Sequence, residues 1–416
     1  MSFYTEPAQI EPLFIDSSRP VYPELLGAAS ELVEASARLD AAIHPATAKA
    51  LSELVAGMNC YYSNLIEGHH TLPIDIAKAL EEQVKEEGKR DVRSLAEAHI
   101  ASEKWAREQS VSGIAAVTPF LLEIHRRFCE QLPQEQLVLE DGSLMVPGKL
   151  RDRDVKVGRH IAPTHAALES FLDRYASAYG RRMEWASKGG QSKLDGLLAA
   201  FAAHHRLTWI HPFPDGNGRV ARIALDAMIR QCGVNTGCIW SMSRGLAKNS
   251  DEYKAHLAGA DQPRMGDLDG RGNLSEKRLV EFIMFGLKTA KDQARFMSSL
   301  FGLDNLKARV HGYFSRVRFD LAPESEYLYL QVLQAGEFDR GEAARLTGKA
   351  DRTARNILQA LAEEGFLLSD TPKGKVRAGF PVRALGSLFP NLYPAGDVDF
   401  PDQMPTTTTG RAKKRR

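Results

Sequence analysis

The sequence predicts a mainly α-helical protein, with a helical core interrupted by a β-hairpin and a smaller helix-turn-helix unit near the C-terminus. Three observations support this fold class. Stretches rich in Ala, Leu and Glu place apolar side chains three and four residues apart, as in AASELVEASARLDAAI at 28–43. Residues 139–164 break that periodicity with three glycines, two prolines and the alternating run Val155-Lys156-Val157. From about residue 325, short helical stretches are followed by two short apolar runs typical of strands.

Length and composition limit the protein class. The 416 residues exceed one ordinary domain, and 43% hydrophobic with 26% charged residues indicate a globular chain with real cores. The net charge of +1 provides no overall field that would attract nucleic acid or acidic lipid. No apolar run approaches the ~20 residues of a membrane span, and the N-terminus lacks a signal-peptide pattern. Scattered cysteines predict buried free thiols and a cytoplasmic protein: Cys60, Cys129, Cys232 and Cys238.

The expected elements follow in chain order. Residues 1–20 contain few helix formers, and helical periodicity then runs from Leu25 to about Gln109, including DIAKALEEQVKEEG at 75–88. A further helix is expected at Thr118–Leu132. After the hairpin segment, helices are expected at 165–190, at 193–209, after a loop at 211–217 up to Gly233, and at 250–259, 275–292 and 293–302.

We expect four units from these changes in pattern. They are an N-terminal helical region at 1–110, a core at 111–300, the smaller unit at 301–395 and a disordered basic tail at 396–416.

One segment concentrates reactive residues: His211-Pro212-Phe213-Pro214-Asp215-Gly216-Asn217-Gly218-Arg219-Val220-Ala221-Arg222. It leads into a helix, whose N-terminus favours anions, and its glycines let the backbone approach a phosphate. Arg219 and Arg222 lie three apart on that helix, so both can face one polyphosphate. Asp215 can hold Mg²⁺, and His211 can take a proton from an attacking hydroxyl. The segment therefore predicts phosphoryl or nucleotidyl transfer.

This segment resembles the signature of the Fic (filamentation induced by cAMP) family, His-x-Phe-x-Asp/Glu-Gly-Asn-Gly-Arg-x-x-Arg, at every fixed position. AAFAAHHRLTWI before it, with His204, is similar to the helix that precedes the motif in that family. The insertion with Val155–Gly158 and DGRGNLS at 269–275 are also similar, so the resemblance covers roughly residues 20–300. It implies a Fic-type helical core with a β-hairpin flap.

The resemblance implies transfer of AMP from Mg-ATP to a Ser, Thr or Tyr hydroxyl of a target protein or of the chain itself. His211 would be the general base, Asp215 would bind the Mg²⁺ between the α- and β-phosphates, and Phe213 would anchor the loop. The nucleotide would be held by Gly216, Asn217, Gly218, Arg219, Val220, Ala221 and Arg222, with Asn249 in the following helix as a candidate for the adenosine side. The target would pair with the flap residues Val155, Lys156, Val157 and Gly158 by strand addition.

A second motif, Ser63-Asn64-Leu65-Ile66-Glu67-Gly68, follows a helical stretch that begins near Thr47. Glu67 lies one turn after Ser63, and Gly68 would end the helix. The residues alone form an ordinary surface pattern, but they resemble the family's inhibitory motif, Ser/Thr-x-x-x-Glu-Gly/Asn. The resemblance implies that Glu67 pairs with Arg222 and displaces the γ-phosphate; an Arg–carboxylate pair can replace an Arg–phosphate pair. A subsidiary hypothesis is that Glu67 positions a water for AMP removal.

The C-terminal unit is similar to a winged helix-turn-helix domain. The pattern predicts a first helix at 340–346, a turn, and a recognition helix at 351–364 capped by Asp351, with strands at 367–369 and 376–378 around the wing TPKGK. Candidate DNA-phosphate contacts are Arg352, Arg355, Lys373, Lys375 and Arg377. Glu363 and Glu364 dilute this basic face, so a protein-binding winged helix stays open as the alternative.

Other interpretations remain open at this point. The core could use a different nucleotide or phosphodiester donor, because no residue identifiably reads the base. The protein could also be a DNA-binding regulator whose Fic core senses nucleotide or modifies itself, although a pure sensor has no need of His211. The oligomeric state is open, with a homodimer as one option. His69-His70 and His204-His205 lack partners at zinc spacing and are expected to be structural.

Overall fold

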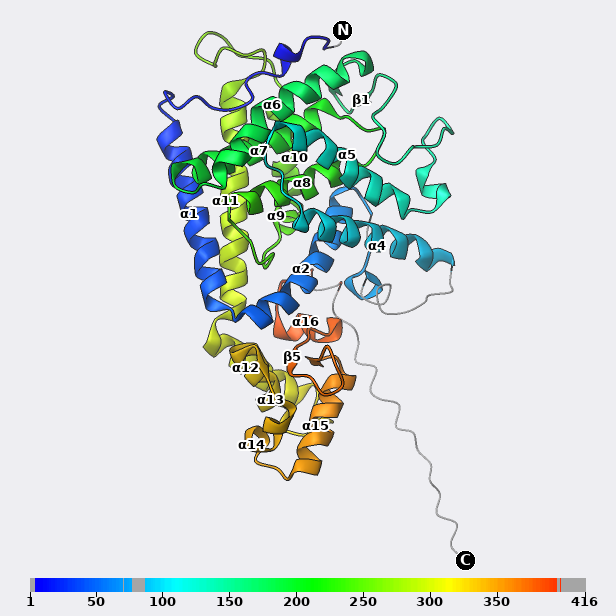
Figure 1. Ribbon diagram of the computed structural model, residues 1–416, viewed down its shortest axis with the longest axis vertical. Coiled ribbons are helices and arrows are strands. Elements are labelled where there is room, and N and C mark those ends of the chain that lie inside the picture. The colour runs from blue at the N-terminus through cyan, green and yellow to red at the C-terminus, as the bar shows by residue number, and fades with distance from the viewer. Residues whose placement is uncertain (1–3, 70, 77–86, 395–396, 398–416) are drawn as a thin grey trace, which may run out of the picture.

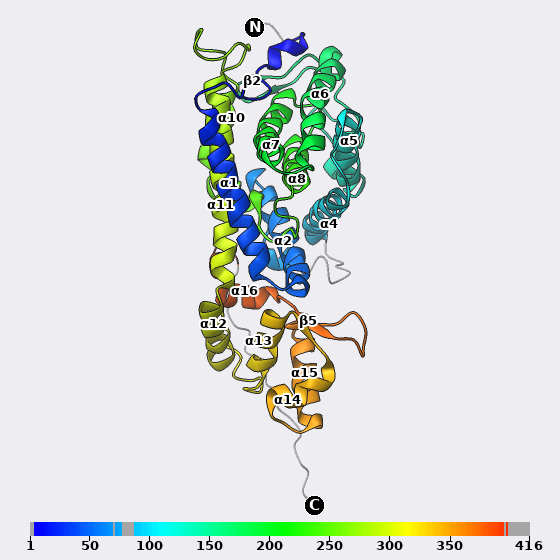
Figure 2. The same cartoon turned by 60° about the vertical axis from the view of Figure 1, so that its left-hand side comes forward.

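The computed structural model describes residues 4–69, 71–76, 87–394 and 397, and the predicted helix DIAKALEEQVKEEG lies mostly outside this range. Figures 1 and 2 show an elongated molecule, with a large helical body and a smaller C-terminal unit at one end. The described helices of the body are α1 (Tyr22–Ala42), α2 (Pro45–Ile66), α4 (Glu87–Glu108), α5 (Ile114–Glu130), α6 (Leu168–Ala186), α7 (Gln191–Ile210), α8 (Asn217–Gln231), α9 (Met242–Lys248), α10 (Ser250–Ala260) and α11 (Glu276–Phe301). The prediction of a mainly helical protein is confirmed.

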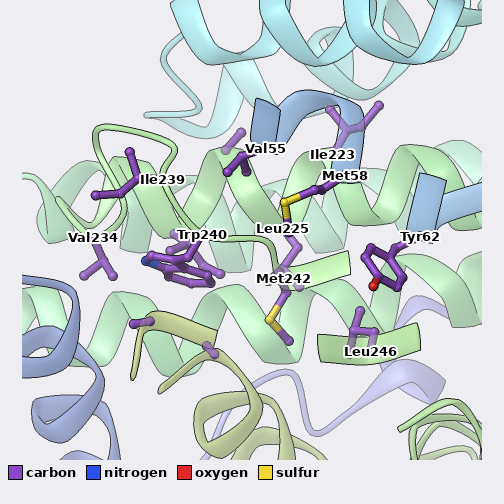
Figure 3. Packing of buried hydrophobic residues seen from close by; sticks show 14 of the residues in the cluster. Val55, Met58, Tyr62, Ile223, Leu225, Val234, Ile239, Trp240, Met242 and Leu246 are labelled. Carbon is purple, nitrogen blue, oxygen red and sulfur yellow. The ribbon is translucent and has the colours of Figure 1, made fainter. Parts of the chain in front are cut away.

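The body is built around α7, whose sequence LLAAFAAHH is apolar on nearly every face and is therefore buried almost throughout. It packs against α6, α8 and α11, and α1 lies along α11 (Figure 2). One apolar layer joins α2 to α8 and α9, where Val55, Met58 and Tyr62 gather with Ile223 and Met242 (Figure 3). This layer places the C-terminal end of α2 beside the first turns of α8.

Several element boundaries differ from the sequence prediction. Residues 276–301 form the single helix α11 rather than two helices, because KTAKDQARFMSS contains neither Gly nor Pro to interrupt it. The short helix α9 was not expected, since Gly245 lowers the helix propensity of its seven residues. The hairpin at 139–164 is present as β1 (Lys156–Val157) and β2 (His160–Ile161), with Val155 outside the strand. Brief 3₁₀ turns occur at Pro7–Ile10, Gln134–Leu137 and His165–Ala167.

The C-terminal unit contains α12 (Leu303–Arg316), α13 (Ser325–Ala335), a 3₁₀ turn (Arg340–Glu342), α14 (Ala343–Thr347), α15 (Asp351–Glu363) and α16 (Val382–Leu388). Its strands β3 (Glu337–Phe338), β4 (Leu367–Leu368) and β5 (Val376–Ala378) form an antiparallel sheet in the order β3-β5-β4. The predicted helix, turn, helix and strand pair are present, whereas β3 and α12 were not expected. The prediction that Asp351 caps α15 was wrong: Ala350 holds the N-cap position, and no side chain caps the helix.

Two further predictions can be checked in the described residues. The four cysteines are free and buried, as expected. No helix in the described part of the chain is long and apolar enough to cross a membrane.

Candidate functional site

The loop between α7 and α8 begins at His211, which ends α7 in a left-handed backbone conformation with φ 51° and ψ 62°. This conformation is uncommon for residues other than glycine. The following residue is Pro212, which disfavours the α conformation in the residue before it and so ends the helix here. Burial lowers the pKa of His211 to about 4, so its imidazole is neutral at physiological pH. Nδ1 of His211 lies 3.4 Å from the carbonyl oxygen of Thr208, and a proton on Nδ1 would leave Nε2 as the basic atom.

The side chain of Asn217 closes the loop on itself. Its Nδ2 donates to the carbonyl oxygen of Phe213 at 2.8 Å, and its Oδ1 accepts from the Phe213 N–H at 2.9 Å. Phe213 is buried, as expected for an anchor. The backbone at Gly216 has φ 78°, a conformation that glycine adopts without strain. Both polar atoms of the Asn217 side chain are therefore bonded to the loop, and the backbone N–H of Asn217 remains available to an anion.

A buried arginine that the sequence analysis missed connects this loop to the hairpin segment. Arg151 donates from Nε to the carbonyl oxygen of His211 at 2.8 Å and from Nη2 to that of Pro163 at 2.5 Å. Its backbone N–H donates to the carbonyl oxygen of Pro212 at 3.0 Å. Arg151 stands in the charged run RDRD, which reads as a solvated surface, so no local signal could have identified it.

A buried histidine supports the loop from the opposite side and was also missed. The ring of His125 in α5 stacks on Phe213, with centroids 4.0 Å apart and planes 3° apart. Its Nδ1 accepts from the N–H of Gly148 at 2.9 Å, and burial lowers its pKa to about 4. A Cβ on Gly216 would lie 3.6 Å from this ring. His125 thus fills the space beneath the loop as a neutral ring.

The first turns of α8 carry two buried arginines directly after the loop. Arg222 donates from Nε to Oγ of Ser63 at 2.9 Å and from Nη2 to Oε1 of Glu67 at 2.5 Å. Only 3% of the Arg222 side chain is exposed, against 32% of the Glu67 side chain. Arg219 lies over the ring of Phe128, 5.2 Å from its centroid. Within the described residues, Nε and Nη2 of Arg219 have no hydrogen-bond partner, so this buried cation is available to an anion.

The carboxylate of Glu67 occupies the place where the sequence predicts a bound anion. A Cβ added to Gly218 would lie only 2.2 Å from Oε1 of Glu67, so the carboxylate lies directly against the first turn of α8. Burial alone would raise the pKa of Glu67, but Arg222 and Arg219 hold it below the usual value of 4.5. Gly68 has φ 83° and follows the end of α2, as predicted. The N-terminus of α8 and its arginines therefore form an anion site that Glu67 fills from within the chain.

The carboxylate of Asp215 is exposed at the edge of this anion site, and its Oδ1 accepts from the N–H of Gly216 at 2.6 Å. No group of three or more His, Cys, Asp or Glu residues in the described part of the chain is arranged to hold a metal. A Mg²⁺ ion beside Asp215 would therefore take most of its ligands from phosphate and water, which is its usual coordination in nucleotide sites. The residues present fit that group.

The predicted flap lies next to the loop. Its strands pair Lys156 with Ile161 and Val157 with His160, and Gly158 in the turn has φ 61°. Lys156 and Val157 are exposed. Nε2 of His160 lies 2.6 Å from the carbonyl oxygen of Trp209, two residues before His211. The hairpin is thus attached to the end of α7 while its first strand is open to solvent.

Asn249 does not lie within a helix but links α9 to α10, and its Nδ2 donates to the carbonyl oxygen of Gly245 at 3.0 Å. It lines a cavity of about 510 Å³ together with residues of α1, α10 and α11. None of the described residues that line this cavity belongs to the loop or to α8. The role of Asn249 on the adenosine side stays a prediction.

The histidine pair in α7 has structural contacts, as expected. Nδ1 of His204 lies 3.1 Å from the carbonyl oxygen of Ala221, and its Nε2 lies 2.8 Å from the hydroxyl of Tyr253. His205 contacts the carbonyl oxygen of Leu257 at 3.1 Å. His204 thereby links α7 to α8 and α10. His70 lies outside the described residues.

Comparisons with known proteins agree with this geometry. Residues 118–229 match the model of the Fic/DOC family. The chain is 28% identical over 180 residues to a protein adenylyltransferase Fic of Nematostella vectensis, covering 42% of this chain and 37% of that protein. It is 32% identical over 113 residues to the protein adenylyltransferase fic-1 of Caenorhabditis briggsae, covering 27% of this chain and 19% of that protein. The chain thus aligns with less than two fifths of the length of these curated relatives.

A similarity in fold extends over most of the chain. A crystal structure of a Fic family protein from Desulfovibrio desulfuricans G20 matches with a TM-score of 0.50 and 16% sequence identity. The match covers 88% of this chain and 98% of that one. At this identity the likeness concerns the fold alone.

Proposed function

We propose that the protein, whose residues 118–229 match the model of the Fic/DOC family, is an adenylyltransferase that moves AMP from ATP to a hydroxyl side chain of a protein. The observation that carries the proposal is the anion site at the start of α8. It combines a helix N-terminus, a glycine without a Cβ at position 218 and two buried arginines, Arg219 and Arg222. Such a site fits the outer phosphates of a nucleotide.

In the proposed reaction, Nε2 of His211 takes the proton from the target hydroxyl as its oxygen attacks the α-phosphorus of ATP. The new P–O bond forms as the bond to the β-phosphate oxygen breaks, and pyrophosphate leaves with that electron pair. The neutral imidazole at physiological pH suits a general base. Arg151 and His125 act as positioning residues, because they hold the backbone and the underside of the loop that carries His211.

A Mg²⁺ ion held by Asp215 would supply positive charge to the phosphate oxygens. The exposed edge of β1 suits an extended target segment, which would add to Lys156 and Val157 by strand pairing. This mode of binding relies on backbone hydrogen bonds and therefore makes few demands on target sequence.

Glu67 restrains this activity in the proposed scheme. Its carboxylate lies against Gly218 and bonds Arg222, so the outer phosphates of ATP cannot take their place until it leaves. Ser63 holds the same guanidinium from α2. A subsidiary hypothesis is that Glu67 orients a water that removes AMP from a modified target.

The experiment that tests the function uses ATP labelled on its α-phosphate, with magnesium, and the wild type, Glu67→Gly and His211→Ala proteins alone or with cell lysate. We expect label on protein with Glu67→Gly, little with wild type and none with His211→Ala. Gel position then distinguishes self-modification from modification of another protein. Absence of label with Glu67→Gly, in a sample that still binds ATP, would reject AMP transfer and direct the search to other donors.

A second function, DNA binding by the C-terminal unit, is favoured by the surface of α15. Arg352 and Arg355 are exposed on this helix, and Lys373 is exposed in the turn between β4 and β5. In contrast, Lys375 and Arg377, also predicted to contact DNA, pair with acidic residues in the same unit. If the unit is a DNA-binding winged helix, Arg352→Ala and Arg355→Ala will each weaken a gel shift and reduce its salt dependence by about one counterion. Equal gel shifts by the wild type, Arg352→Ala and Arg355→Ala proteins would reject this interface.

A further inference from the structure

The C-terminal unit lies against one end of the body, where α2 is one of the helices that it contacts (Figures 1 and 2). Near the start of α2, Oγ1 of Thr47 donates to the carbonyl oxygen of Val332 in α13 at 3.1 Å. Near its end, the hydroxyl of Tyr62 donates to the carbonyl oxygen of Leu392 at 2.8 Å. One helix therefore carries both Glu67 and the attachment of a separate unit.

The segment Phe389–Tyr393, which we call the strap, follows α16 and lies against the C-terminal half of α2. The ring of Tyr393 packs edge-on against Tyr61, with centroids 5.2 Å apart, and parallel to Tyr62, with centroids 6.0 Å apart. Only 5% of Tyr393 is exposed. The hydroxyl of Tyr61 also donates to Asp397 just beyond the strap. Aromatic packing and one hydrogen bond thus join the strap to consecutive residues of α2, and a second hydrogen bond joins Tyr61 to Asp397.

The body holds the strap from a second helix. Arg244 in α9 donates from Nη2 to the carbonyl oxygen of Asn391 at 2.6 Å and from Nε to that of Leu392 at 3.2 Å. The third nitrogen of its guanidinium donates to Gln293 in α11. Arg244 is 2% exposed, so these bonds are made away from solvent. The strap is therefore built into the body rather than laid on its surface.

The strap contacts and the inhibitory contacts adjoin one another on α2. Tyr61 and Tyr62 face the strap, and the next residue, Ser63, accepts from Arg222 in the anion site. Glu67 follows one turn later. Because an α-helix moves as a stiff body over so short a distance, a shift of Tyr62 also shifts Ser63 and Glu67.

We propose that the strap is the restraint that keeps Glu67 on Arg222, so that events at the C-terminal unit regulate the anion site through α2. A ligand that draws the C-terminal unit or the strap away from α2 loosens the helix, frees Arg222 and admits the outer phosphates. This inference deepens the proposed function and rests on it for its effect on AMP transfer. The coupling between strap and α2 itself does not depend on which reaction the site performs.

The test compares Tyr393→Ala and Tyr62→Phe in the full chain with wild type, and uses Tyr327→Ala as the control. Tyr327 is an exposed tyrosine of the same unit, in α13. We expect Tyr393→Ala to raise AMP transfer about three- to tenfold, because it removes the ring of the strap that packs on Tyr61 and Tyr62. Tyr62→Phe, which removes only the hydroxyl, is expected to give a smaller rise, and Tyr327→Ala none. In a Glu67→Gly background, Tyr393→Ala should add nothing.

Hydrogen exchange over residues 63–69 supplies a readout that needs no reaction. The N–H groups of Glu67, Gly68 and His69 donate to carbonyl oxygens of Asn64 and Leu65. Loosening of the end of α2 will therefore speed their exchange in both tyrosine variants. If Glu67→Gly transfers no AMP, the proposed function fails, and faster exchange alone still supports the coupling. Wild-type exchange at 63–69 in folded Tyr393→Ala and Tyr62→Phe proteins would overturn it.

Discussion

Replacement of Glu67 by Gln separates charge from shape at the anion site. The amide has the size of the carboxylate but no negative charge, so it can still accept a hydrogen bond from the charged guanidinium of Arg222 but loses the ion pair. We expect ATP to bind more tightly, because it no longer displaces a carboxylate from Arg222 and Gly218.

The size of this effect follows from the geometry of the pair. An exposed ion pair contributes about 0.2–1 kcal/mol, and breaking a buried one costs about 3–5 kcal/mol. The guanidinium of Arg222 is 3% exposed, but the side chain of Glu67 is 32% exposed, so this ion pair lies between the two cases. Its loss is about 1–2 kcal/mol, which corresponds to a gain of about 5- to 30-fold in ATP affinity.

Titration calorimetry with ATP and magnesium measures this change, in a His211→Ala background that prevents turnover. The matched control is Glu53→Gln, an exposed glutamate on the same helix. Equal ATP affinity in Glu67→Gln and wild type would refute the reasoning, because the carboxylate would then not compete with phosphate. A similar gain in Glu53→Gln would attribute the effect to net charge rather than to the pair with Arg222.

Four further predictions concern the loop and the core. Burial lowers the pKa of His211 to about 4, and only the neutral imidazole accepts a proton. Single-turnover AMP transfer by the Glu67→Gly protein will therefore stay level from about pH 8 to about pH 5.5 and fall only as the pH approaches about 4. A fall in rate centred near about 6.5, the ordinary pKa of histidine, would contradict this. A lysine at position 151 can replace only one of the two hydrogen bonds by which Arg151 joins the His211 carbonyl to that of Pro163. Arg151→Lys will therefore lower kcat about 10- to 100-fold while the affinity for ATP stays unchanged. An unchanged kcat would show that Arg151 does not position the loop. Asp215→Asn will raise the magnesium concentration needed for half-maximal transfer, and an unaltered magnesium titration would exclude Asp215 as a ligand. A Cβ at Gly286 in α11 would overlap the ring of Phe201 in α7. Gly286→Ala will therefore lower the free energy of unfolding, measured in urea, by about 1–3 kcal/mol. If the Gly286→Ala protein is as stable as wild type, α7 and α11 can move apart at little cost.

The sequence predicted the parts of the site that depend on neighbours in the chain. Gly216 adopts a backbone angle that favours glycine, Phe213 is buried, and Gly68 ends α2 beside the glutamate that was expected to face Arg222. Each of these features is encoded within a few residues of the place where it acts, so spacing alone was informative.

The supports of the loop could not be predicted in this way. Arg151 and His125 reach the loop from about 60 and 90 residues upstream, and their local sequences resemble an exposed charged run and a helix interior. Tertiary packing determines these features, and neither propensity nor motif spacing reports it.

The shared use of Gly218 and Arg222 has a consequence for genetics. In the proposed reaction, a substitution at either position would alter the phosphate site as well as the contact with Glu67, so it would not relieve inhibition without lowering activity. A substitution of Glu67 changes only the restraint. In a library of random mutants selected for gain of AMP transfer, activated clones are therefore expected at Glu67 and in the strap and to be missing from residues 211–222.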